Sequence, residues 1–390
     1  KTAGPLRERP ADNASVDFMG FRYRDTSVSA PQLALRQWQN LANAGSVSLY
    51  IMGHLGNHQD RTALTASKPA FDFHKAHEKL YAGLTSAAKV LLVNRPVMAR
   101  NDPESYGWIR ALTESHIPFD EMKLAELKPE LLHRWDVVIL ADLKKLTQEQ
   151  AEMFDTYAEQ GGTVLSTGIL PELRCLGICE VRNSWKDRMS SVFELCEAEK
   201  TLFPRSAEAH YIAPGAILNE VVFCEQTQTC LHLIPEHPFG PPERCYYTEV
   251  SDIPGVGVTP YGKGKGVCLP WLAGSFYFNE GFDNTLHLIQ DVLHQICGLP
   301  ELAPGLHPSV ELVLCKKTDR FLVQLINGSG VFANSYFRPI PMQKIELHLP
   351  GMAGKSVKAL NGGTGVAQSA GDALIITLDQ LNEYEAIEIF

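Results

Sequence analysis

Polar side chains that could bind a ligand gather in two short stretches near the beginning of the chain. Each stretch follows an apolar run that predicts a β-strand, and parallel α/β folds place their ligand sites at the carboxyl ends of strands. Guanidinium, imidazole, amide and carboxylate groups can together hold the hydroxyls of a polyhydroxylated ligand. The candidate ligand-binding residues are Arg22, Arg24 and Asp25 in the first stretch, and His54, Asn57, His58, Asp60 and Arg61 in the second.

Both stretches also have a simpler interpretation, in which their Arg and Asp side chains pair with each other and hold a solvated loop. A catalytic interpretation requires carboxyl groups, because hydrolysis of a glycosidic bond uses two of them, one on each side of the bond. This part of the chain offers Asp17, Asp25 and Asp60, and Asp25 is the candidate general acid or base. One sequence does not identify a pair among them.

Three further patterns predict structure rather than chemistry. His74 and His77 have the spacing of one helix face but lack the H-E-x-x-H pattern, so they predict ordinary core or surface residues. The Gly-rich run at residues 261–266 leads into an apolar strand and not into a helix, which predicts a hairpin turn and not a phosphate loop. No Cys follows the strand predicted at residues 163–166, which disfavours an amidotransferase of the Cys–His type.

The nine cysteines are odd in number and irregularly spaced. In a chain of this size such usage favours free thiols in a reducing compartment, and hence a cytoplasmic location. Cys175 and Cys179 form a C-x3-C pair without a second close pair, so no zinc site is expected. No motif indicates another metal or a cofactor.

The elements that would position the candidate residues form three regions of an α/β chain. Residues 1–88 predict two strand–helix units, with strands at residues 16–21 and 47–52. Pro31 suits the first turn of one helix, and apolar residues at helical spacing over 71–84 predict the other. The order strand–helix–strand–helix is that of a parallel α/β fold.

The second region, residues 89–300, predicts a flavodoxin-like open parallel sheet with a less regular insertion at about residues 170–260. The third, residues 308–390, changes to the alternation of a small antiparallel β-sandwich. The strands expected in the parallel sheet lie at residues 89–94, 119–122, 137–141, 163–166 and 266–271; those of the sandwich lie at 310–314, 321–326, 345–349, 374–378 and 385–389.

The net charge excludes some partners. The 390 residues include 35 Lys and Arg against 45 Asp and Glu, a net charge of −10, whereas phosphate groups attract a basic surface. A nucleic-acid partner or a membrane is therefore not expected, and no apolar run approaches the roughly 20 residues of a membrane-spanning helix. Residues 1–88 carry 10 basic and 7 acidic residues, a net of +3, so the remainder carries −13. The mixed-charge segment is the candidate rim of a substrate site.

Several motifs resemble a known group of enzymes. Residues 28–42 (VSAPQLALRQWQNLA), 50–53 (YIMG) and 71–78 (FDFHKAHE) are similar to the last helices and the last strand of a glycoside hydrolase barrel. Residues 135–140 (WDVVIL), 161–164 (GGTV), 261–264 (YGKG) and 269–271 (LPW) resemble the β-galactosidase trimerisation domain that follows the barrel in family-42 type enzymes. Residues 325–327 (LIN) and 383–385 (EYE) resemble the C-terminal domain of such enzymes.

This resemblance implies a portion of a glycoside hydrolase with a carbohydrate substrate. A complete (β/α)8 barrel takes about 250 residues, so residues 1–88 would be only its last strand–helix units. The chain would then mainly supply the rim of the substrate site, an oligomerisation domain and the β-sandwich. The implied partner is a second copy of the chain, with a trimer as one possibility. The alternative is a non-catalytic scaffold for oligomerisation or carbohydrate binding. If the barrel interpretation is correct, two parallel strands with exposed apolar flanks should lie within residues 1–88.

Overall fold

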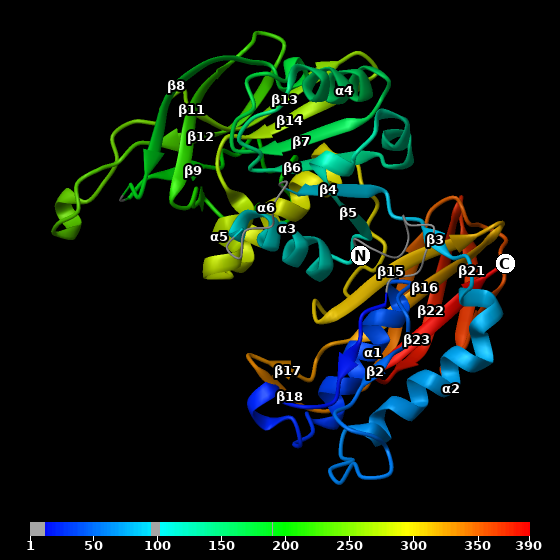
Figure 1. Ribbon diagram of the computed structural model, residues 1–390. Helices are drawn as coiled ribbons and strands as arrows, with labels where there is room; N and C mark the ends of the chain where they lie inside the picture. Colours follow the sequence, from blue (N-terminus) through cyan, green and yellow to red (C-terminus); the bar gives the residue numbers. More distant parts are fainter. Residues whose placement is uncertain (1–11, 95–101, 189) are drawn as a thin grey trace. The chain divides into compact units, whose positions relative to one another are not determined.

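Figure 1 shows the protein as a computed structural model, which describes residues 12–94, 102–188 and 190–390. The chain divides into two compact units. The first holds Lys1–Ala88, His116–Pro118 and Glu301–Phe390, and the second holds Lys89–Ser115 and Phe119–Pro300. The beginning and the end of the chain thus share one unit, and the three-domain division stays a prediction.

The first unit begins with two strand–helix units, as the sequence predicts. The two strands are parallel but shorter than expected, because Met19 N–H donates to the carbonyl of Thr26 and turns the chain back on itself. Pro31 lies in the first turn of the first helix, also as predicted. The elements in chain order are β1 (Ser15–Val16), α1 (Ala30–Ala42), β2 (Leu49–Tyr50) and α2 (Leu64–Tyr81).

Antiparallel strands make up the rest of the first unit, and five of them match the strands predicted for the sandwich. A five-stranded sheet has the order β20 (Val357–Ala359), β23 (Tyr384–Ile389), β16 (Arg320–Asn327), β15 (Val310–Lys317) and β3 (Thr85–Ser86). A three-stranded sheet has the order β19 (Met342–Leu349), β22 (Ala373–Leu381) and β21 (Gly365–Ala370), and a short hairpin joins β17 (Val331–Phe332) to β18 (Ser335–Tyr336).

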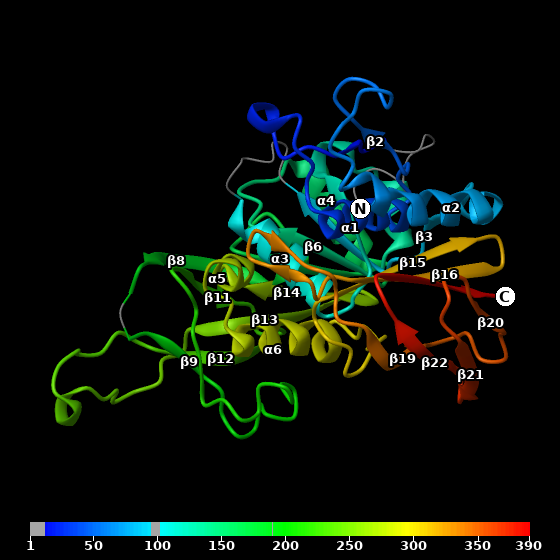
Figure 2. The ribbon, with the colours of Figure 1, turned by 90° about the horizontal axis from the view of Figure 1, so that it is seen from below.

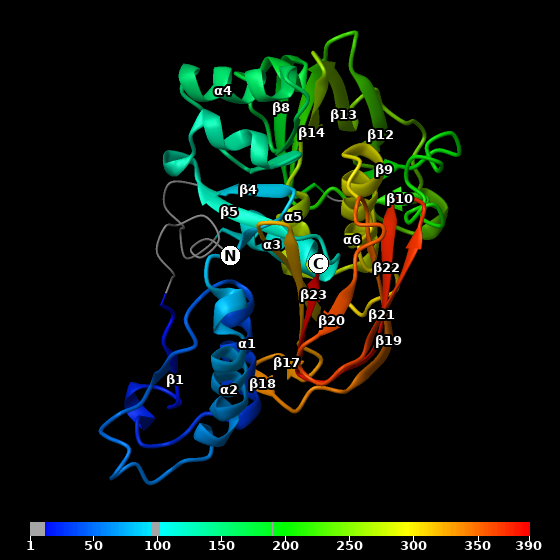
Figure 3. The same ribbon diagram turned by 90° about the vertical axis from the view of Figure 1, so that its right-hand side faces the viewer.

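The five-stranded sheet is buried on both faces. Side chains alternate between the two faces of a strand, so Leu312 and Leu314 lie in a core shared with the three-stranded sheet. Val313 and Cys315 point the other way, into a core shared with α1 and α2. The views in Figures 1 and 3 agree that both helices lie along this sheet. Residues 1–88 therefore do not close into a domain of their own.

A large mixed sheet forms the centre of the second unit. Its parallel strands have the chain order 2-1-3-4-5 of flavodoxin-like sheets, and Figure 3 shows α4 on one face and α3, α5 and α6 on the other. These strands are, from edge to centre, β5 (Phe119–Lys123), β4 (Val90–Asn94), β6 (Val137–Ala141), β7 (Thr163–Thr167) and β14 (Gly264–Leu269). The helices are α3 (Pro103–Glu114), α4 (Gln148–Glu159), α5 (Ala273–Glu280) and α6 (Asp283–Asp291).

The insertion predicted at residues 170–260 extends this same sheet. Four antiparallel strands continue it beyond β14, and Gly262, with a φ of 59°, forms the turn between the last of them and β14. The hairpin predicted at residues 261–266 is therefore confirmed. The added strands are β13 (Pro254–Tyr261), β12 (Gln228–Ile234), β9 (Val192–Glu194) and β10 (Tyr211–Ile212). A separate two-stranded ribbon of β8 (Ile178–Lys186) and β11 (Ile217–Phe223) lies beside them (Figure 2).

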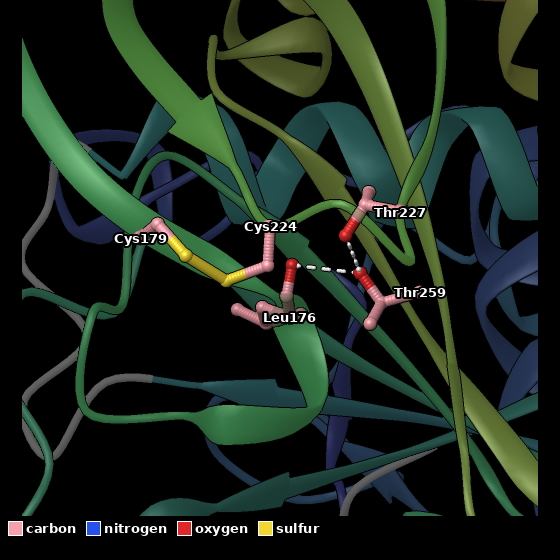
Figure 4. Close-up of a disulfide and its surroundings, with 5 residues drawn as sticks. All are labelled: Leu176, Cys179, Cys224, Thr227 and Thr259. Atoms are coloured by element: carbon pink, nitrogen blue, oxygen red, sulfur yellow. Dashed lines mark hydrogen bonds between the residues drawn. A yellow bond between two sulfur atoms is a disulfide. The ribbon is translucent and has the colours of Figure 1, made fainter.

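A disulfide contradicts the expectation that all cysteines are free thiols. Cys179 in β8 is bonded to Cys224, which follows β11, and the other seven cysteines are free (Figure 4). Between Ile178 and Glu180 the pairing of β8 with β11 shifts, so Cys179 has no partner in the register and faces Cys224. The sequence spacing concealed this pair, because its two members meet only through the folding of the ribbon.

A buried carboxylate fixes the start of α5. Glu104 accepts hydrogen bonds from Trp108 Nε1 at 2.8 Å, from the backbone N–H of Gly274 at 3.2 Å and from that of Ser275 at 2.6 Å. Burial raises the pKa of Glu104 to about 7, although these hydrogen bonds oppose the shift.

No helix within the described ranges is long and apolar enough to cross a membrane.

We expect the stability of the second unit to fall as the pH rises from about 4.5 to about 7. Glu104 binds its proton more tightly in the folded than in the unfolded chain, so this stabilisation is complete at low pH and is lost as Glu104 ionises. The loss corresponds to roughly 3 kcal/mol. Urea unfolding at several pH values measures it, and Glu104→Gln should flatten the pH dependence. An unchanged pH dependence in the variant would assign the effect to other groups.

Candidate functional site

The loops that follow β1 and β2 lie together because the two strands are parallel neighbours. Asp17 comes directly after β1, and its backbone is held on both sides. Its N–H donates to the carbonyl of Tyr50 at 3.1 Å, and its carbonyl accepts from Val28 N–H at 2.7 Å. The residue is completely buried. A carboxyl group is thereby fixed at the carboxyl end of the strand pair.

The loop after β2 brings His58 to this carboxyl group. Nε2 of His58 lies 2.8 Å from Oδ2 of Asp17, and both side chains are buried. Both carboxyl oxygens of Asp17, and Nε2 of His58, are buried and make no well-aligned hydrogen bond with the described residues. Burial raises the pKa of Asp17, His58 opposes this rise by its charge and its hydrogen bond, and the charge of Asp60 adds to it.

Asp60 connects the same loop to the turn after β1. Its Oδ2 accepts from the backbone N–H of Ser27 at 2.9 Å, and its Oδ1 accepts from the N–H and the hydroxyl of Thr62 at 3.1 and 2.7 Å. The bond from Ser27, followed by those from Thr62, lowers the pKa of Asp60. Asp60 thus holds the two loops together as an ionised carboxylate.

Backbone contacts, and not an Arg–Asp pair, hold the loop after β2. Arg61 donates from Nε to the carbonyl of His58 at 3.1 Å and from a terminal nitrogen to that of Leu55 at 2.7 Å. Asn57 accepts from His54 N–H at 3.2 Å, and Nδ1 of His54 accepts from a neighbouring backbone N–H. The simpler interpretation of residues 54–61 predicted an ion pair between Arg and Asp side chains of the loop. That prediction is wrong, since Arg61 does not bind Asp60.

The candidate residues in the loop after β1 are more exposed to solvent. Arg22, Arg24 and Asp25 are exposed, and their side chains make no hydrogen bond or ion pair with the described part of the chain. The alternative of an Arg–Asp pair is thus not seen here either. Their roles in substrate binding, and that of Asp25 as an acid or base, stay predictions.

An exposed apolar surface adjoins the buried pair. Phe18, next to Asp17 in the chain, contacts the rings of Phe21 and Tyr50 at centroid distances of 5.9 and 5.8 Å. Phe21 is 82% exposed, and Tyr50, Tyr23, Met19 and Leu55 are also exposed. Two parallel strands with exposed apolar flanks are what the barrel interpretation requires. Aromatic faces beside a few polar groups are also typical of ligand sites.

The histidines on α2 have a structural role, as predicted. The ring of His77 packs against Phe73 at a centroid distance of 4.6 Å, and that of His74 packs edge-on to Tyr81 at 6.0 Å. In the described ranges no group of three or more His, Cys, Asp or Glu residues could hold a metal ion.

Sequence reasoning gave Asp17 no role beyond that of one carboxyl group among three. The signal that could have singled it out is its position directly after a strand, whereas Asp25 follows eight residues later. The pairing of Asp17 with His58 left no sequence signal, because it depends on the register between β1 and β2.

The fold is similar to part of the fold of several glycoside hydrolases. No protein-family model and no curated protein sequence matches the chain, but solved structures do. α-L-Fucosidase isoenzyme 2 from Paenibacillus thiaminolyticus has a TM-score of 0.74 at 18% identity, over 96% of this chain and 59% of that chain. The family-42 β-galactosidase Gan42B has a TM-score of 0.62 at 15% identity, over 99% and 54%. The β-galactosidase from Bacillus circulans sp. alkalophilus gives 0.60 at 13%, over 94% and 55%. The chain therefore spans little more than half the length of these enzymes.

Proposed function

We propose that the chain is a portion of a glycoside hydrolase that cleaves a glycosidic bond with paired carboxylates. In this proposal β1 and β2 are the last two strands of a (β/α)8 barrel, and their loops form the rim of the substrate site. The observation that carries the proposal is the buried Asp17–His58 pair at the carboxyl end of two parallel strands. Residues 89–300 would assemble the oligomer, and the β-sandwich would complete the chain.

The side chains around the pair suit a sugar. Asp17 supplies a fixed carboxyl group, and the polar residues Arg22, Arg24 and Asp25 lie on the loop that follows it. The exposed rings of Phe21 and Tyr50 offer apolar faces for the C–H surface of a sugar ring. A second carboxyl group on the other side of the glycosidic bond is still required. We infer that it comes from outside the described residues.

We expect this chain to bind simple sugars weakly and to hydrolyse aryl glycosides at a rate close to the uncatalysed background. One carboxyl group of a catalytic pair is insufficient for the reaction. Backbone NMR with added galactose or L-fucose would locate binding, and release of nitrophenol from aryl galactosides and fucosides would measure hydrolysis. Shifts should cluster at residues 17–28 and 50–61, and Asp17→Asn should reduce them.

Two results would contradict the proposal. Rapid hydrolysis by the chain alone would mean that it contains a complete catalytic site. Shifts confined to the antiparallel sheets would favour the scaffold alternative, in which the chain binds carbohydrate through its β-sandwich without taking part in catalysis.

A further inference from the structure

The two oxygens of the Asp17 carboxyl group have different surroundings. Oδ2 lies 2.8 Å from Nε2 of His58, the distance of an ion pair, and the structure gives no such contact for Oδ1. Both oxygens and Nε2 are buried and make no well-aligned hydrogen bond with the described residues. A buried polar atom without a partner destabilises the folded chain. Such atoms are rare in native structures, and a ligand that supplies the missing donor is one explanation for them.

The backbone that carries the Asp17 side chain is held in place. Its backbone is pinned by Tyr50 on one side and by Val28 on the other. The carbonyl of His58 is held by Arg61 Nε, and the loop that carries His58 is tied to the turn after β1 through Asp60. The backbone positions of Asp17 and His58 are therefore fixed by hydrogen bonds that neither side chain makes.

We propose that His58 is the positioning residue of Asp17: it engages Oδ2 and thereby presents Oδ1 to a hydroxyl group of a sugar ligand. This inference rests on the proposed function, since it names the ligand of the same site. A sugar hydroxyl donates one hydrogen bond and can approach a single carboxylate oxygen. For His58 to donate from Nε2, that nitrogen must carry a proton.

The charged groups that act on Asp17 are few. His58 favours the ionised carboxylate by its charge and its hydrogen bond, and Asp60 disfavours it by its negative charge. Burial has the largest influence and also disfavours ionisation. The backbone N–H of Asp17 also favours ionisation, but less than His58 does. Removing the imidazole would therefore take away the largest influence that favours the ionised carboxylate.

The first test measures the titration of the Asp17 carboxyl carbon by 13C NMR in the full chain, with Asp17→Asn identifying the signal. In His58→Phe we expect the pKa of Asp17 to rise further above its ordinary value, because the favourable influence of His58 is lost. His58→Gln keeps an N–H donor and should give an intermediate value. His54→Phe is the matched control, since His54 is exposed on the same loop and bonds only locally. An Asp17 titration that is unchanged in His58→Phe would overturn the positioning role.

The second test follows galactose and L-fucose binding in the same variants. We expect His58→Phe to weaken binding about tenfold, the equivalent of one hydrogen bond, with partial recovery in His58→Gln. Equal binding in wild type and His58→Phe would overturn the role of Oδ1 toward sugar. If the wild-type chain binds neither sugar, the proposed function fails at this site, while the carboxyl titration still decides whether His58 positions Asp17.

Discussion

Replacing Trp38 by alanine is expected to lower the free energy of unfolding of the first unit by about 3–5 kcal/mol. Trp38 is only 2% exposed and lies where α1 meets the five-stranded sheet. Its ring is stacked on Tyr384 at a centroid distance of 4.5 Å and an angle of 6°, and meets Phe73 edge-on at 5.7 Å. Neighbouring side chains would fill so large a cavity only in part, and the ring contacts would be lost.

Hydrogen exchange of the α1 and β16 amides measures this loss within the first unit. Both elements contribute to the same core, so their protection should fall together in Trp38→Ala. Phe21→Ala is the matched control, because Phe21 is 82% exposed and its removal should change stability by no more than about 0.5 kcal/mol. Equal effects of the two substitutions would contradict a shared core between the beginning and the end of the chain.

Removing the disulfide with Cys179→Ser and Cys224→Ser is expected to destabilise the second unit by up to about 4 kcal/mol. The bond closes a sequence separation of 45 residues, and its loss gives the unfolded chain more freedom. The cross-link joins β8 to the residue after β11 at one end of the ribbon, where Cys224 N–H also donates to the carbonyl of Gly177 at 2.8 Å. The folded ribbon should therefore persist, with lower stability.

Thiol alkylation followed by mass measurement tests the bond directly. The unfolded, unreduced chain should accept seven alkyl groups, in agreement with the seven free cysteines, and the reduced chain should accept nine. Cys196→Ser is a control for the stability measurement, because it removes an exposed free thiol and no bond. Nine groups without reduction would show that the disulfide is absent and would restore the expectation of free thiols.

Many elements could be predicted because their signals are local. Thr147 and Gln150 form the reciprocal hydrogen bonds of a capping box at the start of α4, and Thr followed three residues later by Gln is a local sequence signal for the start of a helix. The alternation along residues 310–314 predicted β15 because neighbouring residues of a strand face opposite sides. The apolar runs of β4 and β6 were equally clear, since strands buried on both faces are rich in apolar residues.

The strand lengths near the site were less predictable. The run at residues 16–21 looks apolar enough for a longer strand, but β1 ends at Val16 because the backbone after Asp17 bonds to its own turn. Phe21 and Met19 are exposed in this unit, although they are apolar. Their apolar character therefore predicted a buried strand that does not form.

The sequence by itself determined the local elements, the change from parallel to antiparallel strands, and the two polar loops at the carboxyl ends of β1 and β2. The tertiary structure alone decided which distant residues meet. It paired Asp17 with His58, bonded Cys179 to Cys224 and stacked Trp38 on Tyr384. The physical reason is that helix and strand signals act over a few residues, whereas these contacts depend on strand register and on the packing of segments far apart in the chain.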